Sequence, residues 1–221
     1  MSVRISVSTI KNGSMKSPEL DFHSVLTART AFLQENNVDP ADTTLVNLTY
    51  ETDDFCRYET VTDEQKGDGI TRSASIEADA AVVTRPGHAL LLPLADCIGA
   101  VIHDPTTTIL MLSHFGRHNL DQSGGTVCIN YLVDKHGIDP KNLTVWLSPA
   151  AGKDYYPLYA FDNRSLHDVA IEQLIAAGIQ PQNITASPVD SAADANYFSH
   201  SQFLKGNRET DGRFAIIAMM I

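Results

Sequence analysis

Three stretches of the chain repeat apolar positions with the period of an α-helix, at residues 22–36, 125–136 and 166–177. Each is followed by an asparagine or glycine suited to a left-handed helix C-cap, and then by a proline that blocks further helix. A run of strand-forming residues comes after each proline. The pattern therefore predicts three helix–loop–strand units, with the stop signals Asn37 and Pro40, Gly137 and Pro140, and Gly178 and Pro181.

The middle of the chain has a different pattern. Residues 79–114 hold short apolar β-type runs separated by Pro, Gly and Asp-Pro signals, which predicts a buried, hairpin-rich sheet. Residues 212–221, "GRFAIIAMMI", end in a nearly continuous apolar strand that needs cover on both faces. These elements predict the α+β class. No linker or charge run divides the chain, so we expect one domain over residues 1–221.

Composition narrows the function classes. A net charge of −11, a pI near 5.0 and the lack of a basic cluster argue against a nucleic-acid partner. The first residues lack the apolar core of a signal peptide, and no run approaches the roughly 18 apolar residues of a membrane span. We therefore expect a cytoplasmic protein with no membrane partner. Cys56, Cys97 and Cys128 are odd in number and widely spaced, which favours free thiols over disulfides.

Cys97 and His114 are separated by a segment typical of an antiparallel hairpin, "IGAVIHDPTTTILMLS". With its turn centred between Pro105 and Thr106, Cys97 stands directly opposite His114, with the Cβ atoms about 5 Å apart. At that distance a thiol and an imidazole can share a proton, or bind zinc or copper. The alternative is that Cys97 is a small core residue and His114 a structural residue at a strand end.

A family resemblance follows from "EADAAVVTRPGHALLLPLADCIGAVIHDP", "LSHFGRHN", "DANYFSHSQF" and "DGRFAIIAM", in this order. Roughly residues 45–221 are similar to the bacterial laccase-domain or multicopper polyphenol oxidase-like family, also called purine nucleoside phosphorylase-like. The resemblance implies a four-layer α/β/β/α sandwich with mixed sheets, related to the cytotoxic-necrotizing-factor deamidases. It also implies phosphorolysis of purine nucleosides, deamination of adenosine, and a zinc ion bound by two His and one Cys. Copper-dependent phenol oxidation is the older label.

The implied metal site transfers to this chain only in part. Cys97 matches the cysteine ligand and His114 matches the histidine that opens the family's "HAGWRG" motif. The family's other histidine ligand has no counterpart in "LTYETDDFCRYETV", where Cys56, Glu51 or neither takes its place. We favour Cys56 slightly because a thiolate is the stronger zinc ligand.

Further candidates come from the changed motif "HFGRHN" and from the late motifs. Arg117 and His118 lie in a Gly-broken loop before the helix expected near Gly125, a suitable place for a phosphate or carboxylate. The resemblance places His200 in "YFSHSQF" and Arg213 in "DGRF" near the active face. We expect Arg117 to be catalytic together with Cys97 and His114, and His118, His200 and Arg213 to bind substrate.

Three functions remain open. The leading hypothesis is an enzyme of purine nucleosides at a Cys97–His114 metal site, with zinc, or copper, as cofactor. Its partners would be a small-molecule nucleoside and phosphate, and the protein would be a monomer or homodimer. The second hypothesis is a metal-free hydrolase with Cys97 as nucleophile and His114 as base. The third is a family member that has lost catalysis and acts as a binding module.

Overall fold

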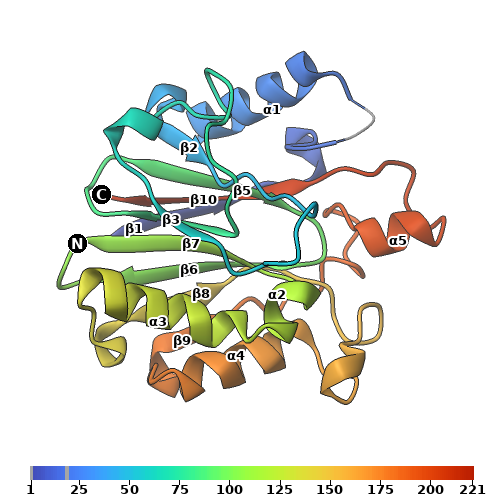
Figure 1. Ribbon diagram of the computed structural model, residues 1–221. Coiled ribbons are helices and arrows are strands. Elements are labelled where there is room, and N and C mark those ends of the chain that lie inside the picture. Colours follow the sequence, from blue (N-terminus) through green and yellow to red (C-terminus); the bar gives the residue numbers. More distant parts are fainter. Residues whose placement is uncertain (1, 18–19) are drawn as a thin grey trace.

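The computed structural model describes residues 2–17 and 20–221, and its strands form two mixed sheets (Figure 1). In the four-stranded sheet, three strands run antiparallel to their neighbours and the short edge strand β2 is parallel to β5. The order across this sheet is β1 (Val3–Val7), β10 (Phe214–Met220), β5 (Ala89–Leu94) and β2 (Thr43–Leu45).

The six-stranded sheet is antiparallel in its centre and has a parallel pair at each edge. Its order is β3 (Tyr58–Thr60), β4 (Ala80–Val83), β7 (Ile109–Phe115), β6 (Ile98–Asp104), β8 (Thr144–Leu147) and β9 (Ile184–Ala186). The two sheets pack face to face through the apolar side chains of β4 to β7 and β10.

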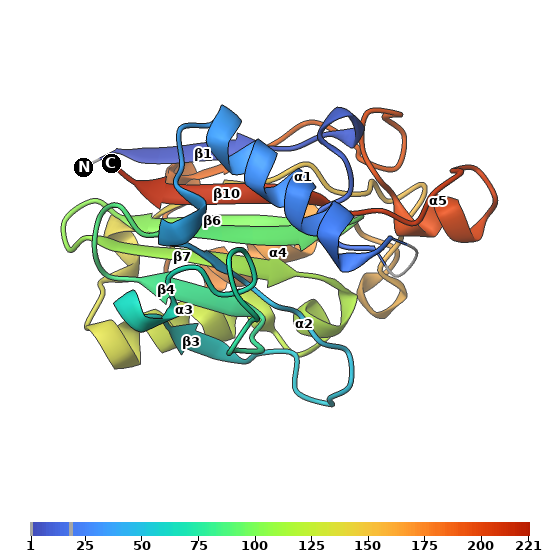
Figure 2. The ribbon, with the colours of Figure 1, turned by 90° about the horizontal axis from the view of Figure 1, so that it is seen from above.

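Helices cover the outer faces of both sheets (Figures 1 and 2). Helix α1 (Phe22–Glu35) packs on the four-stranded sheet, whereas α3 (Gly124–His136) and α4 (Leu166–Ala176) pack on the six-stranded sheet. Two short helices, α2 (Arg117–Asp121) and α5 (His200–Leu204), lie at one end of the sheets. The α+β class with mixed sheets is thus confirmed, and the relation to the deamidase fold stays a prediction.

The packing of strand β10 explains why its sequence is apolar throughout. Phe214, Ile216 and Ala218 pack in the core between the sheets, whereas Ala215 and Ile217 pack in the core beneath α1. Alternate residues of a strand face opposite sides, so a strand covered on both faces needs apolar residues at every position. The prediction of a doubly covered strand here is confirmed.

The three helix–loop–strand units are confirmed: α1 leads to β2, α3 to β8 and α4 to β9. Asn37, Gly137 and Gly178 have φ values of 55°, 67° and 100°, the left-handed conformation expected after each helix. The three prolines also begin short 3-10 helices, at Pro40–Asp42, Pro140–Asn142 and Pro181–Asn183. Among residues 2–17 and 20–221, we find no helix with the length and hydrophobicity to span a membrane.

The prediction of one sheet over residues 79–114 is wrong. β4, β6 and β7 belong to the six-stranded sheet, but β5 pairs with β10 and β2 in the other sheet. The chain returns from β5 to β6 through residues 95–97, and Asp96 has a φ of 70° at this crossing. The local pattern did not reveal the crossing because the partners of β5 are distant in sequence.

The predicted hairpin register is also wrong. His114 pairs with Gly99, Phe115 pairs with Ile98, and Cys97 precedes the first residue of β6. The cause is a longer turn, in which Asp104 Oδ1 accepts hydrogen bonds from both the amide and the hydroxyl of Thr106, at 2.7 and 2.6 Å. Asp and Thr side chains commonly stabilise such turns, and the extra turn residues shift the strand pairing.

Candidate functional site

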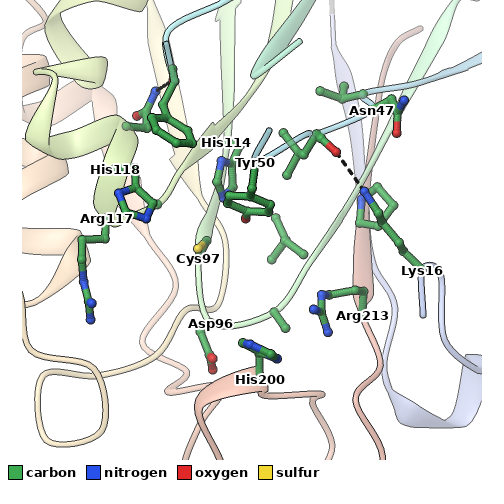
Figure 3. A pocket seen from close by; sticks show the side chains of 18 of the residues that line it. Lys16, Asn47, Tyr50, Asp96, Cys97, His114, Arg117, His118, His200 and Arg213 are labelled. Carbon is green, nitrogen blue, oxygen red and sulfur yellow. Dashed lines mark hydrogen bonds between the residues drawn. The ribbon is translucent and has the colours of Figure 1, made fainter. Parts of the chain in front are cut away.

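A cavity of about 550 Å³ opens at the end of the two sheets where β5 leads into β6. Two of its lining segments belong to α2 and α5, which lie at the end of the sheets opposite the two ends of the chain (Figure 1). Residues from seven parts of the chain line it, at 16–17, 45–55, 93–97, 114–119, 156, 200 and 213, and Figure 3 shows most of them. The lining side chains with polar or aromatic groups are Lys16, Ser17, Asn47, Tyr50, Phe55, Asp96, Cys97, His114, Arg117, His118, Asn119, Tyr156, His200 and Arg213.

Cys97 and His114 are neighbours in this cavity despite the wrong register. The Cys97 Sγ atom and the His114 Nε2 atom each lie 3.0 Å from the point where a Cβ on Gly116 would stand. Gly116 therefore leaves the space between the two side chains free. The structure brings the thiol and the imidazole together because Cys97 ends the crossing from β5 while His114 lies near the end of β7.

Both groups are neutral at pH 7. Burial raises the pKa of Cys97 to about 12; the Asp96 carboxylate adds to this rise, and Arg213 and Arg117 oppose it. Burial lowers the pKa of His114 to about 4, and electrostatic interactions with Lys16 and His118 act in the same direction. The pair is therefore a thiol beside an uncharged imidazole, and a thiolate–imidazolium pair of the kind that activates a cysteine nucleophile is disfavoured.

This charge state predicts a slow cysteine. At pH 8, after dialysis against a chelator, we expect iodoacetamide to alkylate Cys97 on the order of fifty-fold more slowly than N-acetylcysteine, because little thiolate is present. The alkylation rate of Cys97 should continue to rise at high pH, where the rate of an ordinary thiol, of pKa about 8.5, has already reached its plateau. Peptide mass spectrometry follows each cysteine, with Cys97→Ser identifying the signal. Rapid labelling of Cys97 at neutral pH would contradict the prediction.

Asp96 fixes the backbone beside Cys97. Its carboxylate is buried and accepts hydrogen bonds from the Ser199 hydroxyl at 2.5 Å and the Ser201 amide at 2.6 Å, both at the start of α5. Its carbonyl oxygen accepts a hydrogen bond from the Ala151 amide at 2.8 Å. These bonds attach α5 and the loop after β8 to the crossing, so the position of Cys97 depends on both.

Arg117 and His118 lie on one wall of the cavity, on the short helix α2 instead of the loop that was expected. The Arg117 guanidinium lies 4.6 Å from the ring centroid of Tyr156, and its buried Nε atom has no hydrogen-bond partner among the described residues. The His118 ring stacks on Phe55 at a centroid distance of 4.7 Å. This wall therefore offers aromatic faces together with one cation.

His200 and Arg213 lie on another wall, where both bind Asp211. The His200 Nδ1 atom lies 2.9 Å and the Arg213 Nη1 atom 2.5 Å from Asp211 Oδ1. Burial alone would raise the pKa of Asp211, but the hydrogen bonds from Arg213 and His200 lower it overall. The cavity thus brings together six predicted site residues: Cys97, His114, Arg117, His118, His200 and Arg213.

The two proposed third metal ligands lie elsewhere. The Cys56 Sγ atom contacts the Asn119 amide at 3.6 Å and the Gln122 carbonyl at 4.0 Å, and Cys56 does not line the cavity. Glu51 is exposed and also lies outside the lining. The described residues include no group of three His, Cys, Asp or Glu side chains that could hold a metal ion. Because catalytic zinc usually takes three protein ligands, Cys97 and His114 do not fit the three-ligand site that the resemblance implied.

Sequence reasoning missed several lining residues. Tyr50 and Phe55 lie within the segment that lacks the expected histidine, and their aromatic character in a polar stretch was the only signal. Tyr156 follows "SPAAGKD" in the loop after β8, and its aromatic character was likewise its only signal. Lys16 carried no signal, because it lies in a short segment before α1 that reaches the cavity only through tertiary contacts.

Comparisons with known proteins agree with this architecture. A family model described as multi-copper polyphenol oxidoreductase laccase matches residues 19–161. The solved structure of Bacillus licheniformis hypothetical protein YfiH is 20% identical, with a TM-score of 0.84 over 99% of this chain and 93% of that chain. YlmD from Geobacillus stearothermophilus is 19% identical, with a TM-score of 0.83 over 99% and 92% of the two chains.

A Neisseria meningitidis protein of the DUF152 family is 16% identical, with a TM-score of 0.75 over 99% of this chain and 94% of that one. A search of curated proteins found no match. At these identities the likeness to solved structures shows a shared fold, and the function has to be argued from the cavity.

Proposed function

Because the chain belongs to the multi-copper polyphenol oxidoreductase laccase family, we propose that it is an enzyme of purine nucleosides whose substrate binds beside Cys97 and His114. The proposed reaction is phosphorolysis, with deamination of adenosine as a related activity. The observation that supports it is a cavity of about 550 Å³ that combines aromatic faces with cations in an acidic protein. This volume falls within the roughly 300–1,000 Å³ of small-molecule sites.

The lining residues suit both substrates of this reaction, the nucleoside and the phosphate. Tyr50, Phe55 and Tyr156 offer faces on which a purine base can stack. Arg117 offers a guanidinium for phosphate, with its Nε atom unpartnered among the described residues. Phosphorolysis forms a bond between C1′ of the ribose and a phosphate oxygen, breaks the bond between C1′ and the base, and leaves the base with a proton. The Cys97 thiol and the neutral His114 imidazole act as hydrogen-bonding groups at the reacting position.

The direct test is product analysis by chromatography. Adenosine, inosine and guanosine are incubated with the protein, with and without phosphate, and the free base, ribose 1-phosphate and deaminated nucleoside are measured. We expect phosphate-dependent release of base by the wild type and loss of this release in Cys97→Ala and His114→Ala. Binding of nucleoside without conversion would contradict the proposal and favour the binding module.

The neutral state of Cys97 and His114 argues against the metal-free hydrolase.

Zinc, or copper, is the cofactor that the family implies, and we expect this chain to hold it weakly through Cys97 and His114 alone. Elemental analysis after dialysis should therefore find well under one metal ion per chain, because one of the usual three protein ligands is missing. Cys56→Ala should leave the metal content unchanged, and Cys97→Ala should lower it further. One zinc per chain in the wild type, lost in Cys56→Ala, would identify Cys56 as a ligand and contradict this expectation.

A further inference from the structure

Two cations line the cavity on the side away from Arg117 (Figure 3). Lys16 belongs to the segment before α1, and Arg213 directly precedes the first residue of β10. Figure 3 shows Cys97 between this side and Arg117, so the cavity has positive charge on two separate walls. We call the side formed by Lys16 and Arg213 the cationic wall. The proposed phosphorolysis uses only Arg117, which leaves the cationic wall without a role.

The backbone holds the two cations of the cationic wall together. Met15 is fully buried, and its amide donates to the Arg213 carbonyl at 2.8 Å. The Arg213 amide donates to the Ser14 hydroxyl at 2.9 Å, and Arg29 Nε donates to the Met15 carbonyl at 2.7 Å. The segment that carries Lys16 is therefore attached to the segment that carries Arg213. The fold positions both cations before any ligand arrives, which lowers the entropy cost of binding.

The cationic wall carries an excess of positive charge. Although Lys16 keeps accessible surface at the mouth of the cavity, desolvation by the surrounding protein lowers its pKa, and the charges of Arg29 and Arg213 lower it further. Glu77 raises the pKa of Lys16, but its effect is smaller than those of desolvation, Arg29 and Arg213. The Lys16 ammonium donates to the Leu48 carbonyl at 2.9 Å, a neutral acceptor. Arg213 also pairs with Asp211, yet Arg29 and Arg213 still act on Lys16 as like charges, and an anion between Lys16 and Arg213 would relieve this repulsion.

We propose that the cationic wall binds a phosphate group carried by the substrate itself, so that the substrate is a phosphorylated nucleoside. The inference rests on the proposed function for the base and the reaction, and adds the position of a second phosphate. A phosphate monoester has a charge of about −1.5 to −2 at pH 7, which matches two cations. Arg117 on the opposite wall remains free for the attacking phosphate, and Cys97 and His114 lie between the two anion sites.

Binding measurements test the cationic wall without requiring turnover. Isothermal titration calorimetry compares ribose 5-phosphate with ribose, and adenosine 5′-monophosphate with adenosine, on the full chain. We expect the phosphorylated member of each pair to bind at least about tenfold more tightly. Lys16→Met should remove most of this preference, and Lys16→Arg should retain it. The matched control is Lys11→Met, because Lys11 is exposed and does not line the cavity.

The outcomes separate this inference from the proposed function. Equal binding of ribose 5-phosphate and ribose, or a full preference in Lys16→Met, would overturn the inference even if adenosine were converted. A Lys16-dependent preference for ribose 5-phosphate would support it even if no nucleoside were converted. If inorganic phosphate bound as tightly as ribose 5-phosphate with the same dependence on Lys16, the wall would hold free phosphate, and the inference would again be overturned. Circular dichroism melting of each variant verifies that it is folded.

Discussion

Gly116→Ala is expected to lower the proposed phosphorolysis of purine nucleosides by about a hundredfold while the protein stays folded. The new Cβ would stand 2.8 Å from His114 Cε1 and 3.0 Å from Cys97 Sγ, closer than side-chain atoms normally approach. His114 is 4% exposed and has little room to retreat, so the methyl group would separate the imidazole from the thiol. A displacement of about 1 Å in a catalytic group commonly costs about a hundredfold in rate.

The measurement is the rate of phosphate-dependent base release, together with a thermal melt. Gly137→Ala is the control, because Gly137 has a φ of 67° and no atoms near the position of its Cβ. Gly137→Ala strains the backbone by about 1 kcal/mol at a position that does not line the cavity. Its rate of base release therefore shows how much activity is lost through lower stability alone. Wild-type turnover in Gly116→Ala would show that the open space between Cys97 and His114 is not needed for the proposed reaction.

Phe214→Ala is expected to lower the free energy of unfolding by about 3–5 kcal/mol. Phe214 is fully buried between the two sheets, and its ring packs edge-on against Tyr197 at a centroid distance of 5.2 Å. Removing the ring leaves a void at the point where the sheets meet beside the cavity. Because interiors are closely packed, the surrounding side chains fill such a void only in part.

Urea unfolding followed by circular dichroism measures this loss as a lower midpoint with an unchanged slope. The matched control is Phe22→Ala, since the same residue type is 64% exposed at the start of α1 and its removal creates no void. Similar midpoints for the two variants would contradict the assignment of Phe214 to the central core.

The elements that depend on local patterns could be predicted from the sequence. Helical periodicity and the stop signals after it located α1, α3 and α4, since capping chemistry acts over only a few residues. The doubly covered β10 was predicted because its apolar run has no polar face. The division of residues 79–114 between two sheets was not predicted, because the partners of β5 come from both ends of the chain.

The candidate site was predicted in part, although Cys97 and His114 come together through a different geometry from the one predicted. Cys97 and His114 were expected to meet across a hairpin, yet the longer turn moves Cys97 out of register with His114. They still meet because the crossing from β5 delivers Cys97 to the end of β7. Lys16 could not be predicted at all, because its place in the cavity depends on the bond between Met15 and Arg213.

The position of β10 in the four-stranded sheet has a consequence for biosynthesis. This strand follows every other described element in sequence, yet it lies between β1 and β5, and the bond from Met15 joins Arg213, the residue before it, to the N-terminal segment. Until β10 has emerged from the ribosome, strand β1 lacks the partner with which it pairs, and the segment of Lys16 lacks its bonds to Arg213. The cavity is therefore incomplete until β10 inserts between β1 and β5, and we expect ligand binding to begin only after that insertion.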